Sequence, residues 1–261
     1  MDLAGLGVRD VVGVVREARA AAARRGAVVV RGVLAAELAK LLAAHAADAG
    51  AVRVGGDPAG AAALVVVLAG PPGTEDEVAM RAAARALVPV VAVQTDARVD
   101  VRLPHVLPTA VVTCPPGRGF PLDEIAAALA EQLDHEAVSL AAALPALRAR
   151  VARGLVRAAA ARAAAVGALP WRRGADLPVL TAVQARLVLD LAAAHGRAVG
   201  QERAPELAAV AATAFGLRSL VRRLPLRPPL VGALTGYLAT RALGEAATRR
   251  FAADGSVRPG S

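Results

Sequence analysis

Residues 63–68 read ALVVVL, an unbroken apolar run that decides the fold class of the first half of the chain. A strand that is apolar on both sides is typical of a parallel sheet covered by helices on both faces. Further strand-like runs lie at residues 27–30, 51–54, 89–94 and 110–113. Helix-like segments lie between or after them at residues 33–47, 74–87 and 122–133. This alternation predicts βαβ units and an α/β domain built on a mostly parallel sheet.

The second half of the chain shows helical patterns only. Apolar residues recur at spacings of three and four between residues 180 and 191, which predicts an amphipathic helix. Thr181 and Gln184 predict a capping box at its start, and Gly196 predicts a left-handed C-cap at its end. Further helices are expected over residues 140–166, 201–224 and 229–251. The sequence therefore predicts an all-α domain behind the α/β domain.

The last expected helix carries a ridge of small residues. Gly232, Gly236, Thr240, Gly244 and Thr248 recur every four residues. Such a ridge lets another backbone approach closely, and in bilayers this pattern drives helix pairing. Tight packing inside a soluble helical domain explains it too, and the charged residues between the ridge positions favour this second interpretation. We expect Gly232, Gly236 and Gly244 to be sites of close helix packing.

Charge is distributed unevenly along the 261 residues. Residues 1–144 hold 13 basic and 16 acidic side chains, a balance of −3, whereas residues 145–261 hold 18 basic and 6 acidic ones, a balance of +12. Together these give the net charge of +9. Such asymmetry indicates an anionic partner for the basic half, either a nucleic acid or an anionic membrane surface. With 2% aromatic residues, stacking on single-stranded nucleic acid is disfavoured.

Two groups of arginines are candidate contacts to an anionic surface. Arg172 and Arg173 follow Trp171, a combination that suits either a membrane interface or a contact between domains. Arg218, Arg222 and Arg223 crowd the far end of the helix expected over residues 201–224. An ordinary solvated helix face is the alternative interpretation of this second group.

Segments between Pro170 and Phe251 resemble a bacterial family of unknown function. They are LTAVQ (180–184), HGR (195–197), ERAPEL (202–207), FGLRSL (215–220) and YLATRALG (237–244). The resemblance is to the helical domain of YcjF-type membrane-associated proteins, which is also found behind Era-like GTPase domains. It implies a membrane-associated role or a GTPase partner, and the motifs that carry it are structural.

The first half of the chain resembles an Era-like GTPase in the order of its elements. The resemblance places the run at Leu64–Leu68 at the family's aspartate-to-glycine strand and Gln94-Thr95-Asp96 at its guanine-binding motif. The functional residues do not carry over, because the guanine-binding lysine is absent. A phosphate-binding loop also needs glycines and a lysine, and Lys40, the only lysine, has no glycine-rich loop before it.

Other chemical motifs are weak. The segment Gly70-Pro-Pro-Gly-Thr74 begins like a Walker A motif, but the acidic residues 75–77 that follow would repel a triphosphate. Thr74 and Glu77 instead predict a second capping box. The four histidines have no metal-ligand spacing, and Cys114 is expected to be a small buried side chain. We therefore expect no catalytic residue, cofactor site or metal site.

These observations predict three parts: a degenerate GTPase-like domain over 1–136, an Arg-rich helical domain over 137–251 and a disordered tail over 252–261. The chain starts without the basic region of a signal peptide and has no uninterrupted apolar run of membrane-spanning length. We expect a non-enzymatic adaptor or scaffold at the cytoplasmic face of the cell membrane. Its partner would be an anionic membrane surface or a membrane protein. A nucleotide-dependent switch, or an accessory partner of a GTPase, is the alternative.

Overall fold

The computed structural model describes residues 26–44, 46–96, 103, 105–133, 136–169, 177–197 and 228–255. The chain divides into two compact units, and the division falls between Val151 and Ala152, inside helix α6 (Pro145–Ala168). The first unit is an α/β domain and the second is helical, which confirms the predicted fold class.

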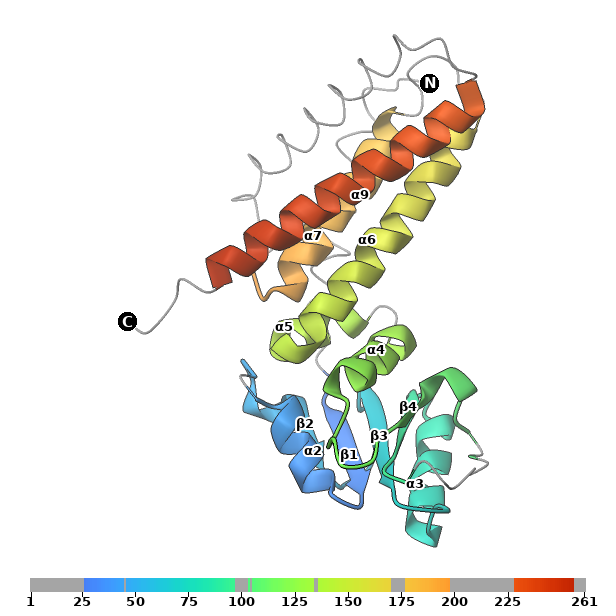
Figure 1. The fold of residues 1–261 in the computed structure, drawn as a ribbon, viewed down its shortest axis with the longest axis vertical. Helices are drawn as coiled ribbons and strands as arrows, with labels where there is room; N and C mark the ends of the chain where they lie inside the picture. The colour runs from blue at the N-terminus through green and yellow to red at the C-terminus, as the bar shows by residue number, and fades with distance from the viewer. Residues whose placement is uncertain are drawn as a thin grey trace. The chain divides into compact units, whose positions relative to one another are not determined.

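A parallel five-stranded sheet forms the centre of the first unit (Figure 1). Its strands are β1 (Val28–Gly32), β2 (Val52–Val54), β3 (Ala63–Leu68), β4 (Val90–Gln94) and β5 (Val111–Thr113). They lie in the order β2-β1-β3-β4-β5, and every neighbouring pair is parallel. All six residues of β3 are buried, as the apolar run predicted. This strand order is a doubly wound order shared by flavodoxin-like folds, so it carries no argument for a GTPase in particular.

Four helices accompany the sheet: α2 (Ala35–Leu42), α3 (Thr74–Arg85), α4 (Leu122–Gln132) and α5 (Ala137–Ala143). Short 3₁₀ turns over Ala49–Ala51 and Pro108–Ala110 lead into β2 and β5. The core holds fully buried large side chains from strands and helices alike, including Leu38, Leu64, Met80, Ile125 and Leu129. Apolar burial of this kind is the dominant favourable term in folding.

The start of α3 corrects one local prediction. Gly73 is extended (φ −71°, ψ 167°) and is the N-cap, so Thr74 already lies in the helix. The carboxylate of Asp76 accepts a hydrogen bond from the Gly73 backbone N–H at 3.3 Å. The predicted Thr74–Glu77 capping box is therefore wrong by one residue, because the chain enters the helix one position earlier than the pattern indicated.

The first compact unit extends past the boundary expected at residue 136. Ala47 N–H donates to the carbonyl of Ala143 in α5 at 2.9 Å, which ties this helix to the α/β domain. The Arg148 side chain, in the first turns of α6, donates to the carbonyls of Ala141 and Ala142 at 3.1 Å each and closes the end of α5. Leu144 and Leu147 are fully buried beside it. The α5–α6 corner is thus built into the core of the first unit.

Three long helices make up the described part of the second unit: α6, α7 (Leu177–Ala194) and α9 (Pro228–Gly255). They run side by side in Figure 1. The Cβ position at Gly232 faces Gly167, and that at Gly236 faces Ala163, so α9 runs antiparallel to α6. The Gln184–Thr240 hydrogen bond and the His195–Phe251 ring contact show that α9 runs parallel to α7.

The two ends of α7 differ in how well the sequence predicted them. The helix begins at Leu177, so Thr181 lies inside it and the predicted Thr181–Gln184 capping box is wrong. Pro178 in the first turn is compatible with this earlier start, because first-turn amides have no intrahelical partner. The C-cap is confirmed: Gly196 is left-handed (φ +72°) and its N–H donates to Ala193 at 2.8 Å. Arg197 N–H donates to Ala192 at 3.0 Å, which completes a Schellman motif.

Two predicted segments fall partly or wholly outside the described residues. The helix expected over 201–224 lies outside them altogether. The tail expected from residue 252 begins inside α9, which continues to Gly255, and residues 256–261 are outside the described range.

Candidate functional site

The carboxyl edge of the sheet is where doubly wound proteins bind ligands. Val33 N–H donates to the carbonyl of Val67 at 3.0 Å, just past the end of β1. The carbonyl of Leu68 accepts from both the backbone N–H and the hydroxyl of Thr95, at 2.8 and 3.2 Å. The backbone carbonyls of Val67 and Leu68, at the end of β3, therefore accept hydrogen bonds from neighbouring segments of the chain.

The turn after β1 has no geometry for cradling phosphates. Only Val33 and Leu34 separate β1 from α2, and Leu34 is in the left-handed region at φ 55°. Gly32 is also left-handed (φ +92°), and a Cβ there would meet the carbonyl oxygen of Val67. This glycine serves close strand packing, whereas Lys40 lies in the last turn of α2.

The start of α3, beside the same edge, is acidic. Glu75, Asp76 and Glu77 occupy its first turn, where they complement the helix dipole. Arg31 reaches this region: it donates to the carbonyl of Gly56 at 3.1 Å and lies 4.0 Å from the Glu75 carboxylate. A single half-buried arginine among three carboxylates does not make this edge an anion site.

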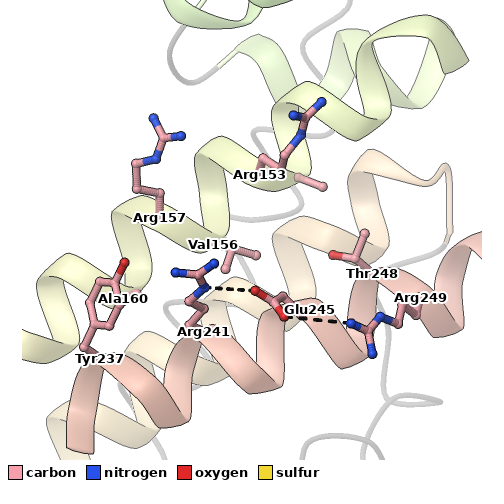
Figure 2. A pocket seen from close by; sticks show the side chains of 10 residues that line it. Arg153, Val156, Arg157, Ala160, Tyr237, Arg241, Glu245, Thr248 and Arg249 are labelled. Atoms are coloured by element: carbon pink, nitrogen blue, oxygen red, sulfur yellow. Dashed lines mark hydrogen bonds and ion pairs between the residues drawn. The ribbon is translucent and has the colours of Figure 1, made fainter. Parts of the chain in front are cut away.

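A hollow of about 390 Å³ lies between α6 and α9 in the helical unit (Figure 2). Its polar lining consists of four arginines, a glutamate and two hydroxyl side chains: Arg153, Arg157, Arg241, Arg249, Glu245, Tyr237 and Thr248. Ala152, Val156 and Ala160 of α6 provide its apolar floor. The described polar side chains that line the hollow are therefore mostly basic, which favours an anionic partner over a cationic one.

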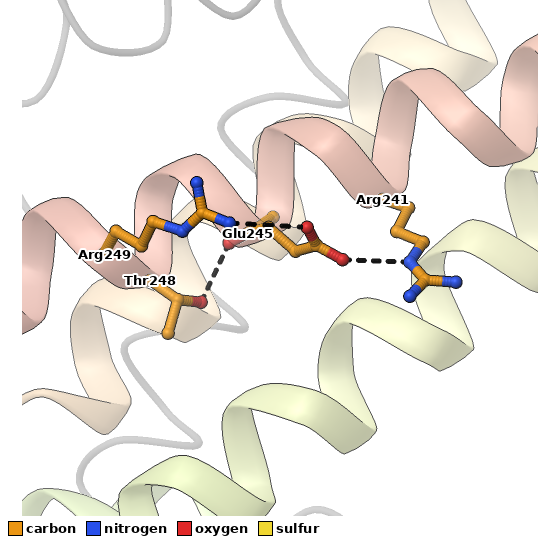
Figure 3. A network of polar contacts seen from close by, with 5 residues as sticks. Arg241, Glu245, Thr248 and Arg249 are labelled. Carbon is orange, nitrogen blue, oxygen red and sulfur yellow. Dashed lines mark hydrogen bonds and ion pairs between the residues drawn. The ribbon is translucent and has the colours of Figure 1, made fainter.

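Glu245 organises the α9 side of this hollow (Figure 3). Its carboxylate lies 2.9 Å from Nε of Arg241 and 4.0 Å from an Nη atom of Arg249, one helical turn away on either side. The hydrogen bond to Glu245, and then the one to Tyr237, raise the pKa of the Arg241 guanidinium. The Thr248 hydroxyl donates to the carbonyl of Gly244 at 2.8 Å. Arg241 is therefore held by Glu245, although its side chain is 56% exposed.

Small residues bring α6 and α9 close together. A Cβ at Gly232 would collide with the carbonyl of Gly167, and one at Gly236 would lie 2.5 Å from the carbonyl oxygen of Ala163. A Cβ at Gly244 would lie 2.5 Å from a methyl carbon of Val156. These are the three glycines for which the sequence predicted close packing. Their contacts in the helical unit fit the interpretation as packing inside a helical domain.

The arginines highlighted from the sequence differ from those that line the hollow. Arg172, Arg173, Arg218, Arg222 and Arg223 all lie outside the described residues. The hollow is lined instead by arginines that sequence reasoning did not single out. A signal was present, because Arg153 and Arg157 are four residues apart, as are Arg241, Glu245 and Arg249. Only the antiparallel pairing of α6 with α9 brings the two sets to one place.

Other reactive side chains of the described residues are engaged in packing. Cys114 is buried, and burial, followed by the nearby Glu124 carboxylate, raises the pKa of its thiol. The ring of His195 contacts Phe251 with centroids 5.9 Å apart, and its Nδ1 lies 2.8 Å from the carbonyl oxygen of Leu191. The guanidinium of Arg197 lies 5.1 Å from the centre of the Phe251 ring. Across the described ranges, no group of three or more His, Cys, Asp or Glu side chains is placed to hold a metal ion.

Comparisons of the chain with protein-family models, with characterised proteins and with solved structures find no match. Among the helices described here, none combines the length and apolarity needed to span a bilayer. The arginine-lined hollow and the charge of the helical unit are therefore the features of the molecule that bear on function.

Proposed function

We propose that the protein is a non-catalytic adaptor that binds an anionic surface through its helical unit. In this proposal the surface is the cytoplasmic face of the cell membrane, and the α/β unit serves as a docking surface for a protein partner. The observation that supports it best is the gathering of Arg153, Arg157, Arg241 and Arg249 around one hollow. The side chains of Arg241 and Arg249 are 56% and 83% exposed, so both are accessible to a large partner.

The energetics are sufficient for reversible binding. A basic residue close to an anionic leaflet contributes about 1 kcal/mol, and the attraction decays within a Debye length of roughly 10 Å at moderate salt. Four arginines that share one face would contribute together, whereas the same number spread around a bundle would not. The overall balance of +12 in residues 145–261 adds long-range attraction to the same partner.

Co-sedimentation with vesicles tests this proposal. The full-length protein should pellet with vesicles of phosphatidylglycerol and phosphatidylcholine at low salt, and should be released as salt is raised. It should stay in the supernatant with phosphatidylcholine alone. Failure to pellet with the anionic vesicles at low salt would contradict the proposal.

The non-catalytic part of the proposal rests on the first unit. A two-residue turn follows β1, and carboxylates occupy the first turn of α3. Both features disfavour a triphosphate at the carboxyl edge of the sheet. Isothermal titration of the purified protein with GTP, GDP and ATP is expected to show no binding heat. Saturable heat with a guanine nucleotide would favour the nucleotide-dependent switch instead.

A further inference from the structure

We propose that one end of the helical unit inserts apolar side chains into the interface of an anionic lipid bilayer. This inference rests on the proposed function and deepens it, because it names the part of the unit that enters the membrane. We call this end the apolar tip and define it as residues 160–169 of α6, 177–183 of α7 and 228–240 of α9. Figure 1 shows these three helix segments at the same end of the unit.

Contacts between the helices place the three segments at one level. Gly167 of α6 faces Gly232 of α9. Gln184 of α7, which directly follows the tip, donates to the hydroxyl of Thr240 of α9. Because α6 is antiparallel to the other two helices, the end of α6 lies beside the starts of α7 and α9.

Large apolar side chains of the helical unit are exposed at this end. Among the described residues of the unit, those that are more than a third exposed are Leu169, Val179, Leu234 and Leu238, at 39–60%. Farther along the same helices, Leu187, Leu191 and Phe251 belong to a buried cluster. Apolar surface in water is unfavourable, and a group of exposed apolar side chains marks a surface that meets a partner.

The charges near the tip favour an anionic bilayer as that partner. Arg162, exposed on α6, is the one charged residue of the three tip segments, which contain no carboxylate. Residues 170–176, between α6 and α7, contain Trp171, Arg172, Arg173 and Asp176, and residues 222–227, before α9, contain Arg222, Arg223 and Arg227. An apolar surface with arginine and tryptophan next to it in the chain is typical of segments that bind the interface of an anionic membrane.

The spacing of the exposed leucines on α9 suits shallow insertion. Leu234 and Leu238 are four residues apart, which is about 6 Å along a helix. Interfacial helices bury their apolar side to a depth of about 5–10 Å. Ala160 and Tyr237 belong to the tip and also line the hollow, so the two surfaces adjoin. The tip therefore adds apolar contact to the electrostatic attraction of the helical unit.

The first experiment removes the apolar side chains of α9 that would enter the bilayer. Full-length Leu234→Gln/Leu238→Gln is titrated with vesicles of phosphatidylglycerol and phosphatidylcholine beside the wild type. Its affinity should fall by at least about tenfold, the factor that corresponds to keeping one leucine side chain out of water. Circular dichroism checks that the variant is folded.

Leu107→Gln is the matched control, because Leu107 of the α/β unit is 59% exposed and Leu234 is 60% exposed. This control should bind like the wild type. Unchanged affinity of the tip variant, or an equal loss in the control, would overturn insertion through the tip while the proposed function stands. Failure of the wild type to bind would reject the two together.

Salt separates apolar insertion from electrostatic attraction. The ratio of wild-type affinity to that of the leucine variant should stay constant within about twofold as salt is raised, because screening acts on charges. The loss caused by Arg162→Gln should instead shrink with salt. A leucine effect that disappears with salt would contradict apolar insertion.

A dye that reports its surroundings tests which part of α9 enters the bilayer. Leu238→Cys and Ala246→Cys, each combined with Cys114→Ala, place a nitrobenzoxadiazole label at an exposed position of α9. On anionic vesicles the label at 238 should shift its emission to the blue and be quenched by brominated acyl chains, whereas the label at 246 should show neither change. No response at 238 would show that the tip stays in water, and equal responses would show that α9 lies flat on the surface. Either result would overturn the tip.

Discussion

The two units of this protein build their cores in different ways, although both draw on a chain with only 2% aromatic residues. The α/β unit buries large apolar side chains on both faces of a sheet, with Leu64, Met80 and Leu129 fully enclosed. The helical unit brings backbones together through Gly232, Gly236 and Gly244. Large side chains fill the core of the first unit, whereas the second unit combines close backbone contacts with an apolar cluster that includes Leu187, Leu191 and Phe251.

The two units also differ in the surfaces that they present to partners. In the α/β unit the strand ends bond to one another and the helix start beside them is acidic. In the helical unit the hollow between α6 and α9 is lined largely by long basic side chains. Close packing of these two helices thus accompanies a cationic lining between them, which is why the second unit is the better candidate for binding an anionic partner.

The largest expected loss of stability comes from removing a large side chain from the core of the α/β unit. Leu64→Ala should lower the free energy of unfolding by about 3–5 kcal/mol, because the lost methyl groups leave a cavity in a strand with no exposed surface. Chemical denaturation measures the loss, and hydrogen exchange should show faster exchange at β1, β3 and β4 amides. Faster exchange in α9 of the same variant would contradict the division into two units.

Filling the close contact between α6 and α9 should lower the free energy of unfolding by somewhat less. Gly236→Leu places a side chain where a Cβ already lies 2.5 Å from the carbonyl oxygen of Ala163, so α9 must move away from α6. A loss of about 2–3 kcal/mol is expected from overpacking, measured by chemical denaturation. Hydrogen exchange should increase in α6 and α9 and stay unchanged in the sheet.

Gly154→Leu is the control, because the Cβ position at Gly154 meets nothing within 4 Å. Wild-type stability of Gly236→Leu would show that the glycine contact does not hold the helices.

Breaking a buried polar pair in the helical unit should lower the free energy of unfolding by a smaller amount. The Gln184 amide donates to the hydroxyl of Thr240 at 3.2 Å, and its oxygen has no hydrogen-bond partner among the described residues. Thr240→Val should cost about 1–2 kcal/mol, because it leaves the rest of the buried amide unpaired. Adding Gln184→Met should recover most of that loss in thermal and chemical denaturation. No recovery in the double variant would mean that the pair stabilises the helices in some other way.

The smallest effect is expected at Cys114 in the first unit. Its thiol pKa is raised, so the contribution of the neutral thiol is fully present below the unfolded-state pKa, about 8.5, and is lost as pH rises through the folded-state value. The unfolding free energy of the wild type should fall relative to Cys114→Ala by less than about 1 kcal/mol between neutral and strongly alkaline pH. Native protein should also react slowly with iodoacetamide at neutral pH. Rapid labelling would show that the thiol is accessible.

Sequence patterns predicted the structure correctly where a single segment determines its own conformation. The run at 63–68 forms a buried strand, as expected because six consecutive apolar residues suit a sheet covered on both faces. Gly196 ended α7 because glycine adopts positive φ without a Cβ penalty. The capping boxes at Thr74 and Thr181 were wrong because both helices begin earlier, at positions that the capping pattern does not reveal.

The sequence by itself determined the α/β-then-helical architecture, the uneven charge and the presence of a glycine ridge, because periodicity, composition and spacing are properties of neighbouring residues. Only the tertiary structure decided that Arg153 and Arg157 line the same hollow as Arg241 and Arg249. This arrangement depends on the antiparallel pairing of α6 with α9, which are separated by a long stretch of chain. It also decided that α5 belongs to the first unit, through the hydrogen bond between Ala47 and Ala143. Contacts between residues far apart in sequence follow from packing, and no local pattern encodes them.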